Sequence, residues 1–448
     1  MTKTIDEVRR HLDEPTARGL ARAVSRAVSD GSLVGGQRLA PIRTVAAELA
    51  LSPTTVSSAW ALLVRSGTIA TDGRRGTVVS TGFGNGPTRY RRALEHTANF
   101  AVDLSTGVPD PTLLPDLGPA FRRLERVASS GSYLDAPVLP ELLAELTRSW
   151  PFEAETLTVV DGAMDALDLL TATTVRYGDR VAVEHPCFPP LLDLLDAVGA
   201  ETIAVDLDDN GPLPGSLATA VAAGATVFHL QPRAQNPTGA SLTETRADAL
   251  ADVLRPTSAI VIENDSAGAV AASPLVSLAD RLPDRVVHIR SYSKSLGPDL
   301  RLAAVGGPAR LLDPVVARRY LGQGWSSRLL QHVLLDLLTQ PASQATVDRA
   351  RAAYADRRSA VVAALAERGI TVGGRDGLNI WLPVADETAA LLRLASAGIG
   401  ATAGAPFAVR RDAPPYLRVT TGLLADDVDR VAGELAAAAR AGSWAGAR

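Results

Sequence analysis

Residues 291–301 read SYSKSLGPDLR, and the lysine in this stretch, Lys294, gives the first indication of the fold. The chain of 448 residues has 45 basic side chains, and the only lysines are Lys3 and Lys294. Arginine therefore fills nearly every position that needs only a positive charge. A lysine amine can lose its proton and attack a carbonyl to form a Schiff base, which a guanidinium cannot do. The sequence thus marks Lys294 as a candidate nucleophile.

Short apolar runs rich in β-branched residues precede this motif and alternate with helical stretches. They lie at residues 157–160, 180–183, 226–230, 259–262 and 285–289. This alternation predicts a mostly parallel sheet wrapped by helices, in which ligands bind beyond the carboxyl ends of the strands. The polar motifs of the chain follow those ends.

Three motifs make a family resemblance specific: SYSK at 291–294 with Arg301 seven residues on, QNPTG at 235–239, and LRVT at 417–420. Together they resemble a fold-type I aminotransferase over about residues 99–448. The resemblance implies an α/β/α fold-type I transferase-like domain that binds pyridoxal 5'-phosphate. Its large part is expected at about 99–330, and a smaller C-terminal α+β subdomain at about 331–448.

The resemblance also implies roles for individual residues. Lys294 would hold the cofactor as a Schiff base. The cofactor phosphate would receive donors and charge from the lysine motif and from the helix that follows the 157–160 strand, whose first N–H groups are free to bind an anion. The residues expected at the phosphate are Ser291, Ser293, Arg301, Ala163 and Met164. An ordinary strand-to-helix junction is the alternative interpretation of residues 162–164.

Four further residues match the family in position. Phe188 would stack on the cofactor ring, or else pack in the core, and Asn236 would bond the phenolic oxygen, or else only form a turn. Arg418 would grip an amino acid's carboxylate with two parallel N–H bonds, with a strand arginine paired to an aspartate as the alternative. Tyr133 would reach the phosphate of a neighbouring subunit, which implies a homodimer.

The sequence departs from the family pattern after the fourth strand. An aspartate that pairs with the pyridine nitrogen is usual there, but residues 263–266 read ENDS, and the best register places Asn264 at that position. Adjacent strand residues point to opposite faces, so Asn264 and Asp265 cannot both meet the ring unless the strand turns there. Both stay candidates. If Asn264 faces the nitrogen, a neutral amide holds the ring proton poorly, and turnover is expected to be slow.

The amino-terminal end is basic. Residues 1–92 carry 14 Lys or Arg against 7 Asp or Glu, so their net charge of +7 contrasts with −11 for the rest of the chain. Apolar residues recur at helical spacing within residues 20–28, 45–49 and 56–63, and two short strands are expected at 68–70 and 77–79. Ser52 can cap the third helix, with Pro53 at its first position.

This order of elements resembles the winged helix-turn-helix of the GntR regulators, over about residues 15–80. The resemblance implies that the helix after Ser52 enters the major groove while arginines hold phosphates or the minor groove. The expected DNA-binding residues are Arg38, Arg43, Thr44, Ser52, Thr54, Thr55, Ser57, Arg74 and Arg75. A winged helix fused to an aminotransferase-like domain is the layout of the MocR branch of this family.

We expect a winged helix-turn-helix domain at residues 1–80, a linker at 81–98 and an effector domain at 99–448. No run of about 20 apolar residues and no secretory signal is present, so membrane insertion and export are not expected. A single cysteine, Cys187, fits a reducing cytoplasm. The histidines and this cysteine show no metal-ligand spacing, so no metal site is predicted.

The leading functional hypothesis is a transcriptional regulator. It would bind a double-stranded DNA operator through residues 15–80 and sense an amine, an amino acid or pyridoxal phosphate itself through residues 99–448, without physiological turnover. A second hypothesis is a working pyridoxal-phosphate aminotransferase with an accessory winged helix. A third is a regulator whose second domain has lost the cofactor and serves only for dimerisation.

Overall fold

A computed structural model describes most of the chain, namely residues 2–29, 32–65, 68–72, 76–79, 89, 100–125, 132–410 and 412–442. Internal contacts divide the chain into two units. The first consists of Met1–Arg92, Val175–Arg180 and Pro190–Thr202, and the second of Ala93–Thr174, Val181–Pro189 and Ile203–Arg448. In the described part of the chain, no helix is both long and apolar enough to cross a bilayer.

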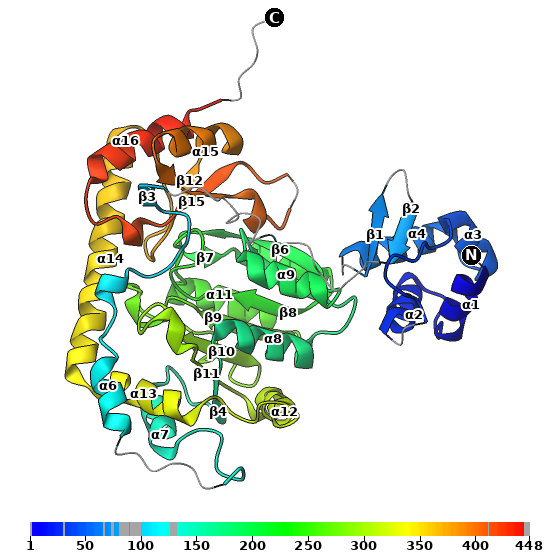
Figure 1. Cartoon of the computed structure of the whole chain (residues 1–448), viewed down its shortest axis with the longest axis horizontal. Helices are drawn as coiled ribbons and strands as arrows, with labels where there is room; N and C mark the ends of the chain where they lie inside the picture. Colours follow the sequence, from blue (N-terminus) through cyan, green and yellow to red (C-terminus); the bar gives the residue numbers. More distant parts are fainter. Residues whose placement is uncertain are drawn as a thin grey trace, which may run out of the picture. The chain divides into compact units, whose positions relative to one another are not determined.

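Four helices and a two-stranded antiparallel sheet make up the amino-terminal elements (Figure 1). They are α1 (Thr2–Arg10), α2 (Ala17–Ser29), α3 (Ile42–Glu48), α4 (Pro53–Arg65), β1 (Ile69–Asp72) and β2 (Gly76–Val79). Leu20 and Val24 of α2 pack against Val56 and Trp60 of α4, as their helical spacing predicts. The structure adds α1, which the sequence analysis did not predict and which contributes Ile5 to the same core.

An eight-stranded sheet forms the centre of the second part, in the order β4-β11-β10-β9-β8-β5-β6-β7. Strands β8, β9 and β10 run parallel, whereas β11 is antiparallel to both of its neighbours. The strands are β4 (Thr156–Val160), β5 (Arg180–His185), β6 (Glu201–Asp208), β7 (Gly211–Pro212), β8 (Ala225–Leu230), β9 (Ile260–Asp265), β10 (Val286–Ser291) and β11 (Ala303–Gly307). Five of them coincide with the five apolar runs of the sequence.

Helices lead from strand to strand or cover this region. They are α6 (Gly118–Leu124), α7 (Pro140–Ser149), α8 (Ala163–Thr174), α9 (Pro189–Ala197), α10 (Pro214–Ala222), α11 (Glu244–Leu254), α12 (Ala309–Tyr320) and α13 (Arg328–Thr339). The 27-residue helix α14 (Pro341–Glu367) then runs along this layer to the C-terminal elements (Figure 1). Its length lets it contact α13 at one end and α16 at the other.

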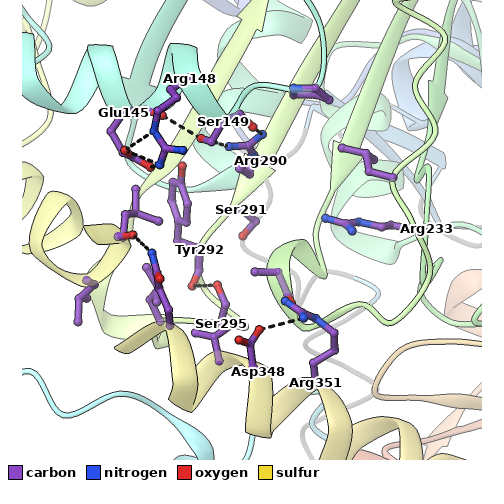
Figure 2. A pocket seen from close by; sticks show the side chains of 18 residues that line it. Glu145, Arg148, Ser149, Arg233, Arg290, Ser291, Tyr292, Ser295, Asp348 and Arg351 are labelled. Atoms are coloured by element: carbon purple, nitrogen blue, oxygen red, sulfur yellow. Dashed lines mark hydrogen bonds and ion pairs between the residues drawn. The ribbon is translucent and has the colours of Figure 1, made fainter. Parts of the chain in front are cut away.

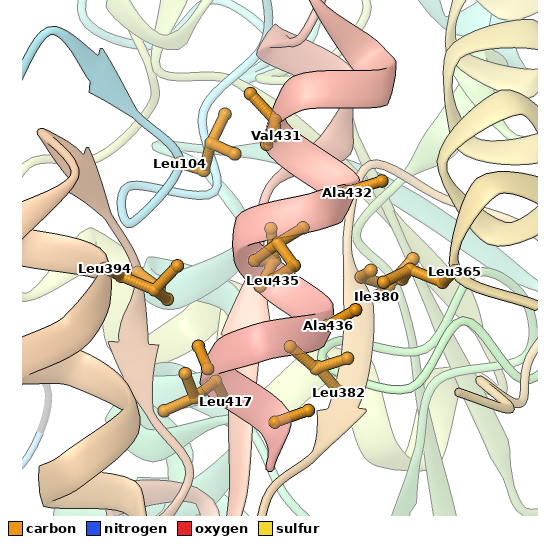
Figure 3. Packing of buried hydrophobic residues seen from close by; sticks show 14 of the residues in the cluster. Leu104, Leu365, Ile380, Leu382, Leu394, Leu417, Val431, Ala432, Leu435 and Ala436 are labelled. Carbon is orange, nitrogen blue, oxygen red and sulfur yellow. The ribbon is translucent and has the colours of Figure 1, made fainter. Parts of the chain in front are cut away.

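The C-terminal elements surround a second core, which is built around α16 (Figure 3). They comprise β12 (Ile380–Pro383), α15 (Glu387–Ser396), β13 (Ile399–Gly400), β14 (Thr402–Ala403), β15 (Tyr416–Val419) and α16 (Val428–Ala439). The early strand β3 (Val102–Asp103) pairs with β13, and Leu104 lies in this same core. The segment 102–104 therefore packs with the C-terminal subdomain, although the sequence analysis assigned it to the large part.

Candidate functional site

The register of three strands brings the predicted phosphate residues to one edge of the sheet. Ala303, at the start of β11, pairs with Ser291 on one side and with Val160 on the other. Ser291 ends β10 just before the turn that carries Lys294, and Val160 ends β4 just before α8. Arg301 lies two residues ahead of Ala303. The lysine turn, Arg301 and the first turn of α8 therefore meet, even though they are far apart in sequence.

Lys294 lies in a setting that favours a neutral amine. Its Nζ donates to the carbonyl oxygen of Gly107 at 2.6 Å. Removal from water lowers its pKa to about 8, and the positive charge of Arg418 acts in the same direction. A deprotonated amine is the nucleophilic form of lysine, so the site raises the fraction of Lys294 that can attack a carbonyl near neutral pH.

The Arg301 guanidinium lies close to Gly162 at the amino end of α8. Gly162 adopts a φ of +99°, and a Cβ at this position would come within 3.1 Å of the Arg301 Nη2 atom. Only glycine combines that backbone conformation with such close approach of a guanidinium. Ala163 and Met164 form the first turn of α8, whose N–H groups have no partners within the helix. The Ser291 hydroxyl accepts from the Ser293 N–H at 3.3 Å.

Asn264 and Asp265 lie on opposite faces of β9, as expected for adjacent strand residues. Both are buried. Asp265 is bound by the Arg233 guanidinium, at 2.8 and 3.1 Å, and by the Gly268 N–H at 3.1 Å. Burial alone would raise the pKa of Asp265, but the charge and hydrogen bonds of Arg233 outweigh it and lower that pKa. The Oδ1 atom of Asn264, by contrast, has no hydrogen-bond partner among the described residues.

The side-chain oxygen of Asn236, like that of Asn264, has no hydrogen-bond partner among the described residues. Asn236 Oδ1 is buried and lacks a partner within the described residues, while its backbone N–H and carbonyl are both bound by the Gln231 side chain. Gln231 also accepts from the Ser266 hydroxyl at 3.1 Å. Leaving a buried polar atom unpaired costs about 1–3 kcal/mol, so two such oxygens indicate a place for a ligand. Gln231 was not predicted as a site residue, because nothing in its sequence context distinguishes it.

Arg418 on β15 is 1% exposed. Its guanidinium donates to the Ser105 carbonyl and to the Thr402 hydroxyl, and it lies 5.4 Å from the centre of the Phe407 ring. Gly107, with a φ of +65°, leaves it space, since a Cβ there would be 3.0 Å from the Arg418 Nη1 atom. Residues 105–107 therefore lie between Arg418 and Lys294. The sequence analysis did not predict this segment. The only signal for it in the sequence was a glycine beside a proline-containing turn.

Two further aromatic candidates occupy different environments. Phe188 is half-buried at the start of α9, and the preceding Cys187 N–H donates to the Phe407 carbonyl at 2.9 Å, which joins this turn to the 404–407 loop. Tyr133 is 91% exposed, with its ring centre 6.3 Å from that of Trp325. Its exposure leaves it accessible to another molecule.

The predicted DNA-binding side chains that the structure describes lie on α3, at the start of α4 or, for Arg38, beside β2. Ser52 caps α4 by accepting from the Thr55 N–H at 2.9 Å. Exposed positions in this region are Arg38, Arg43, Thr44, Ser52, Thr54 and Ser57, with Thr55 half-buried. Arg74 and Arg75 fall outside the described residues. Elsewhere on the first unit, Arg22 pairs with Glu14 and Arg26 with Asp13, so these α2 arginines are partly neutralised.

Comparison with known proteins places this geometry in a family. The model of the aminotransferase class I and II family matches residues 101–435. A vitamin B6 salvage pathway transcriptional repressor of Salmonella typhimurium is 35% identical over 93% of this chain and 96% of its own length. The chain belongs to the MocR-type branch of the GntR regulators. The family match confirms pyridoxal 5'-phosphate, the cofactor of this aminotransferase fold, as the cofactor predicted from the sequence.

A second regulator agrees with this assignment, and a solved structure shows the fold. The pyridoxine biosynthesis regulator of Corynebacterium glutamicum is 28% identical over 78% of this chain and 79% of its own length. The solved structure of a kynurenine aminotransferase from Pyrococcus horikoshii superposes with a TM-score of 0.69 at 22% identity and covers 77% of this chain and 91% of that enzyme. The second likeness confirms the fold-type I aminotransferase fold of this MocR-type regulator.

Proposed function

We propose that this MocR-type regulator binds an operator in double-stranded DNA through its amino-terminal helices and responds to vitamin B6 through its aminotransferase-like domain. The similarity to the Salmonella repressor carries the proposal, because it spans both parts of the chain. On this basis α2 to α4 with β1 and β2 form a winged helix-turn-helix. The first turn of α4 presents short polar side chains, Thr54 and Ser57, which suit contacts in a major groove.

The second domain would hold pyridoxal phosphate with residues that fit it. Lys294 would bind the cofactor covalently, and Arg301 with the first turn of α8 would receive the phosphate. Asn236 and Asn264, whose side-chain oxygens are buried without a partner among the described residues, would face the polar atoms of the ring. Bound there, the cofactor supplies a carbonyl carbon that exchanges with amines and a ring that withdraws electrons. The Arg418 guanidinium would orient the carboxylate of an amino acid beside it.

Asn264 favours sensing over turnover. A neutral amide stabilises a protonated pyridine nitrogen much less than a carboxylate does, and Asp265, the neighbouring carboxylate, is bound by Arg233 on the opposite face. We therefore expect the wild-type protein to convert an amino acid to its ketoacid slowly, and Asn264→Asp to accelerate this conversion. Rapid conversion by the wild type would instead favour an aminotransferase with an accessory DNA-binding domain.

The covalent step has a matched control within the chain, because Lys3 is the only other lysine. The full-length protein is incubated with pyridoxal phosphate, reduced with borohydride and analysed by mass spectrometry of its peptides. Wild type and Lys3→Ala should each carry one cofactor at Lys294, and Lys294→Ala should carry none. Equal labelling of wild type and Lys294→Ala would refute the role of Lys294.

DNA binding is tested by fluorescence anisotropy with the duplex upstream of the protein's own gene. Arg43→Ala should weaken binding and reduce the salt dependence by about one unit of slope, because it removes one phosphate contact. Arg26→Ala serves as the control, since Arg26 is a surface arginine already paired with Asp13. Thr54→Ala should reduce discrimination against a scrambled duplex. Equal effects of the two arginine substitutions would contradict the placement of the DNA on α3 and α4.

The response to the effector is measured in the same assay. Pyridoxal phosphate should change the affinity of the wild type for its operator by roughly 5- to 150-fold, the usual range of allosteric coupling. Lys294→Ala should bind DNA but lose most of this change. A candidate amino acid added with the cofactor then shows whether the ligand sensed is the vitamin or an amine that reacts with it.

A further inference from the structure

A cavity of about 570 Å³ lies beside the turn that carries Lys294 (Figure 2). Its walls come from the ends of α7 and β10, from α13 and from the first half of α14. Ser291, Tyr292 and Ser295 of the lysine turn line it, whereas Lys294, Asn236 and Asn264 do not. It therefore lies next to the site proposed for pyridoxal phosphate and shares only Ser291 with the residues assigned to that site.

The lining of the cavity carries a surplus of positive charge. Arg148, Arg233, Arg290 and Arg351 line it, and the acidic groups in the lining, Glu145 and Asp348, pair with Arg148 and Arg351. Arg233 is neutralised by the buried Asp265. One guanidinium, that of Arg290, has no carboxylate partner among the described residues.

Arg290 is held in place by neutral groups. Its guanidinium donates to the carbonyl and hydroxyl oxygens of Ser149, at 2.7 and 3.1 Å, and lies 4.5 Å from the centre of the Trp150 ring. These contacts fix the position of the group but leave its charge uncompensated. A positioned arginine with free N–H donors suits a carboxylate or a phosphate.

A second observation at the same cavity also points to a ligand. Tyr292 is 4% exposed, and its hydroxyl interacts with the Arg290 guanidinium without forming a hydrogen bond of normal geometry. Its ring extends toward the Glu145–Arg148 pair, beside Arg290 (Figure 2). Because a phenol can still donate its O–H while it accepts from an arginine, this hydroxyl and Arg290 can together bind an anion that enters the cavity.

The remaining wall is apolar. Leu296, Leu337 and Val347 line the cavity and have exposed fractions under 10%. A volume of about 570 Å³ is in the range that accommodates a small organic molecule. The combination of apolar walls with one arginine that has no carboxylate partner among the described residues and a tyrosine hydroxyl beside it selects a ligand with an apolar body and a single anionic group.

We propose that this cavity is a second ligand site, which binds a small organic anion such as an aromatic carboxylate or an aryl phosphate. The anionic group would bind Arg290 and the Tyr292 hydroxyl, and the apolar body would contact the leucine side chains. Because four lining residues, Ser291, Tyr292, Ser295 and Leu296, lie within three positions of Lys294 in the sequence, an occupant is in a position to shift the turn that carries this lysine. The site would thus allow a second metabolite to influence the cofactor-binding lysine.

The test uses isothermal titration calorimetry on the full-length protein after borohydride fixation of the cofactor, so that the Lys294 site is blocked. Phenylacetate, phenyl phosphate and inorganic phosphate are the probes. We expect saturable binding of at least one phenyl-bearing anion with one site per chain and much weaker binding of inorganic phosphate. The preferred phenyl compound distinguishes a carboxylate site from a phosphate site. The same titration on Lys294→Ala should give the same affinity, which keeps this test independent of the cofactor proposal.

Two variants and one matched control locate the binding. Arg290→Ala should weaken binding about tenfold or more, as expected for loss of a charged hydrogen-bond donor. Leu338→Trp should abolish it by filling the cavity. Arg349→Ala on α14, an exposed arginine that does not line the cavity, should bind like the wild type. Absence of binding by both phenyl probes, or equal affinities in wild type and both cavity variants, would overturn the proposal.

Discussion

The two faces of β9 at its carboxyl end differ in how completely their polar groups are paired. On one face, Glu263 accepts from Ser277 and from the Leu278 N–H and contacts His288, and Asp265 is bound by Arg233. On the other face, the Asn264 oxygen is buried without a partner among the described residues. The carboxylates on the first face, which we call the paired face, therefore have their partners within the fold. The face that carries Asn264 is instead suited to a ligand that supplies a hydrogen-bond partner for the Asn264 oxygen.

The largest expected effect on the free energy of unfolding comes from removing the arginine that pairs with Asp265. Arg233→Ala would leave the Asp265 carboxylate buried without its countercharge, and removal of one partner of such a pair costs about 3–5 kcal/mol. Urea unfolding of the full-length protein measures the loss. Arg255→Ala is the control, since it breaks an exposed pair with Asp252 and should cost less than about 1 kcal/mol. A similar loss for both variants would mean that the Arg233–Asp265 pair is not stabilising.

This pairing also explains what the sequence could and could not predict. The strand runs and the SYSK motif predicted the sheet and the location of Lys294 at its edge, because hydrophobic periodicity and strand ends are local properties. The choice between Asn264 and Asp265 stayed open, because it depends on Arg233, whose position beside Asp265 is a tertiary contact. The placement of β11 between β4 and β10 and the contact of Gly107 with Lys294 were also not predicted, for the same reason.

A buried carboxyl on β5 gives the next largest effect. Burial raises the pKa of Glu184 to about 8, partly offset by hydrogen bonds from Gln231 and Gln235. The folded protein therefore binds a proton that the unfolded chain releases near pH 4.5. Its contribution favours the folded state most below that pH and is lost as the pH rises to about 8.

The expected slope from this group alone is up to about 1.4 kcal/mol per pH unit within that window. Urea unfolding at several pH values measures it, and the difference between wild type and Glu184→Gln isolates it from other titrating groups. Glu184→Gln should be more stable than the wild type near pH 8 and should lose less stability between pH 6 and 8. Identical slopes for the two proteins would show that Glu184 is ionised in the folded state.

The smallest effect on stability is expected at Asn264. Without cofactor, Asn264→Ala removes a buried oxygen that has no partner in the described structure, so the lost packing is largely offset and the net cost should be below about 1 kcal/mol. In the placement of pyridoxal phosphate that we propose, the same substitution removes a partner of the ring, so the cofactor should raise the unfolding temperature less than in the wild type. Glu263→Gln provides the contrast, because Glu263 lies on the paired face and its substitution should destabilise the protein equally with and without cofactor. An equal cofactor-induced shift in Asn264→Ala and wild type would show that the unpaired oxygen does not face the cofactor.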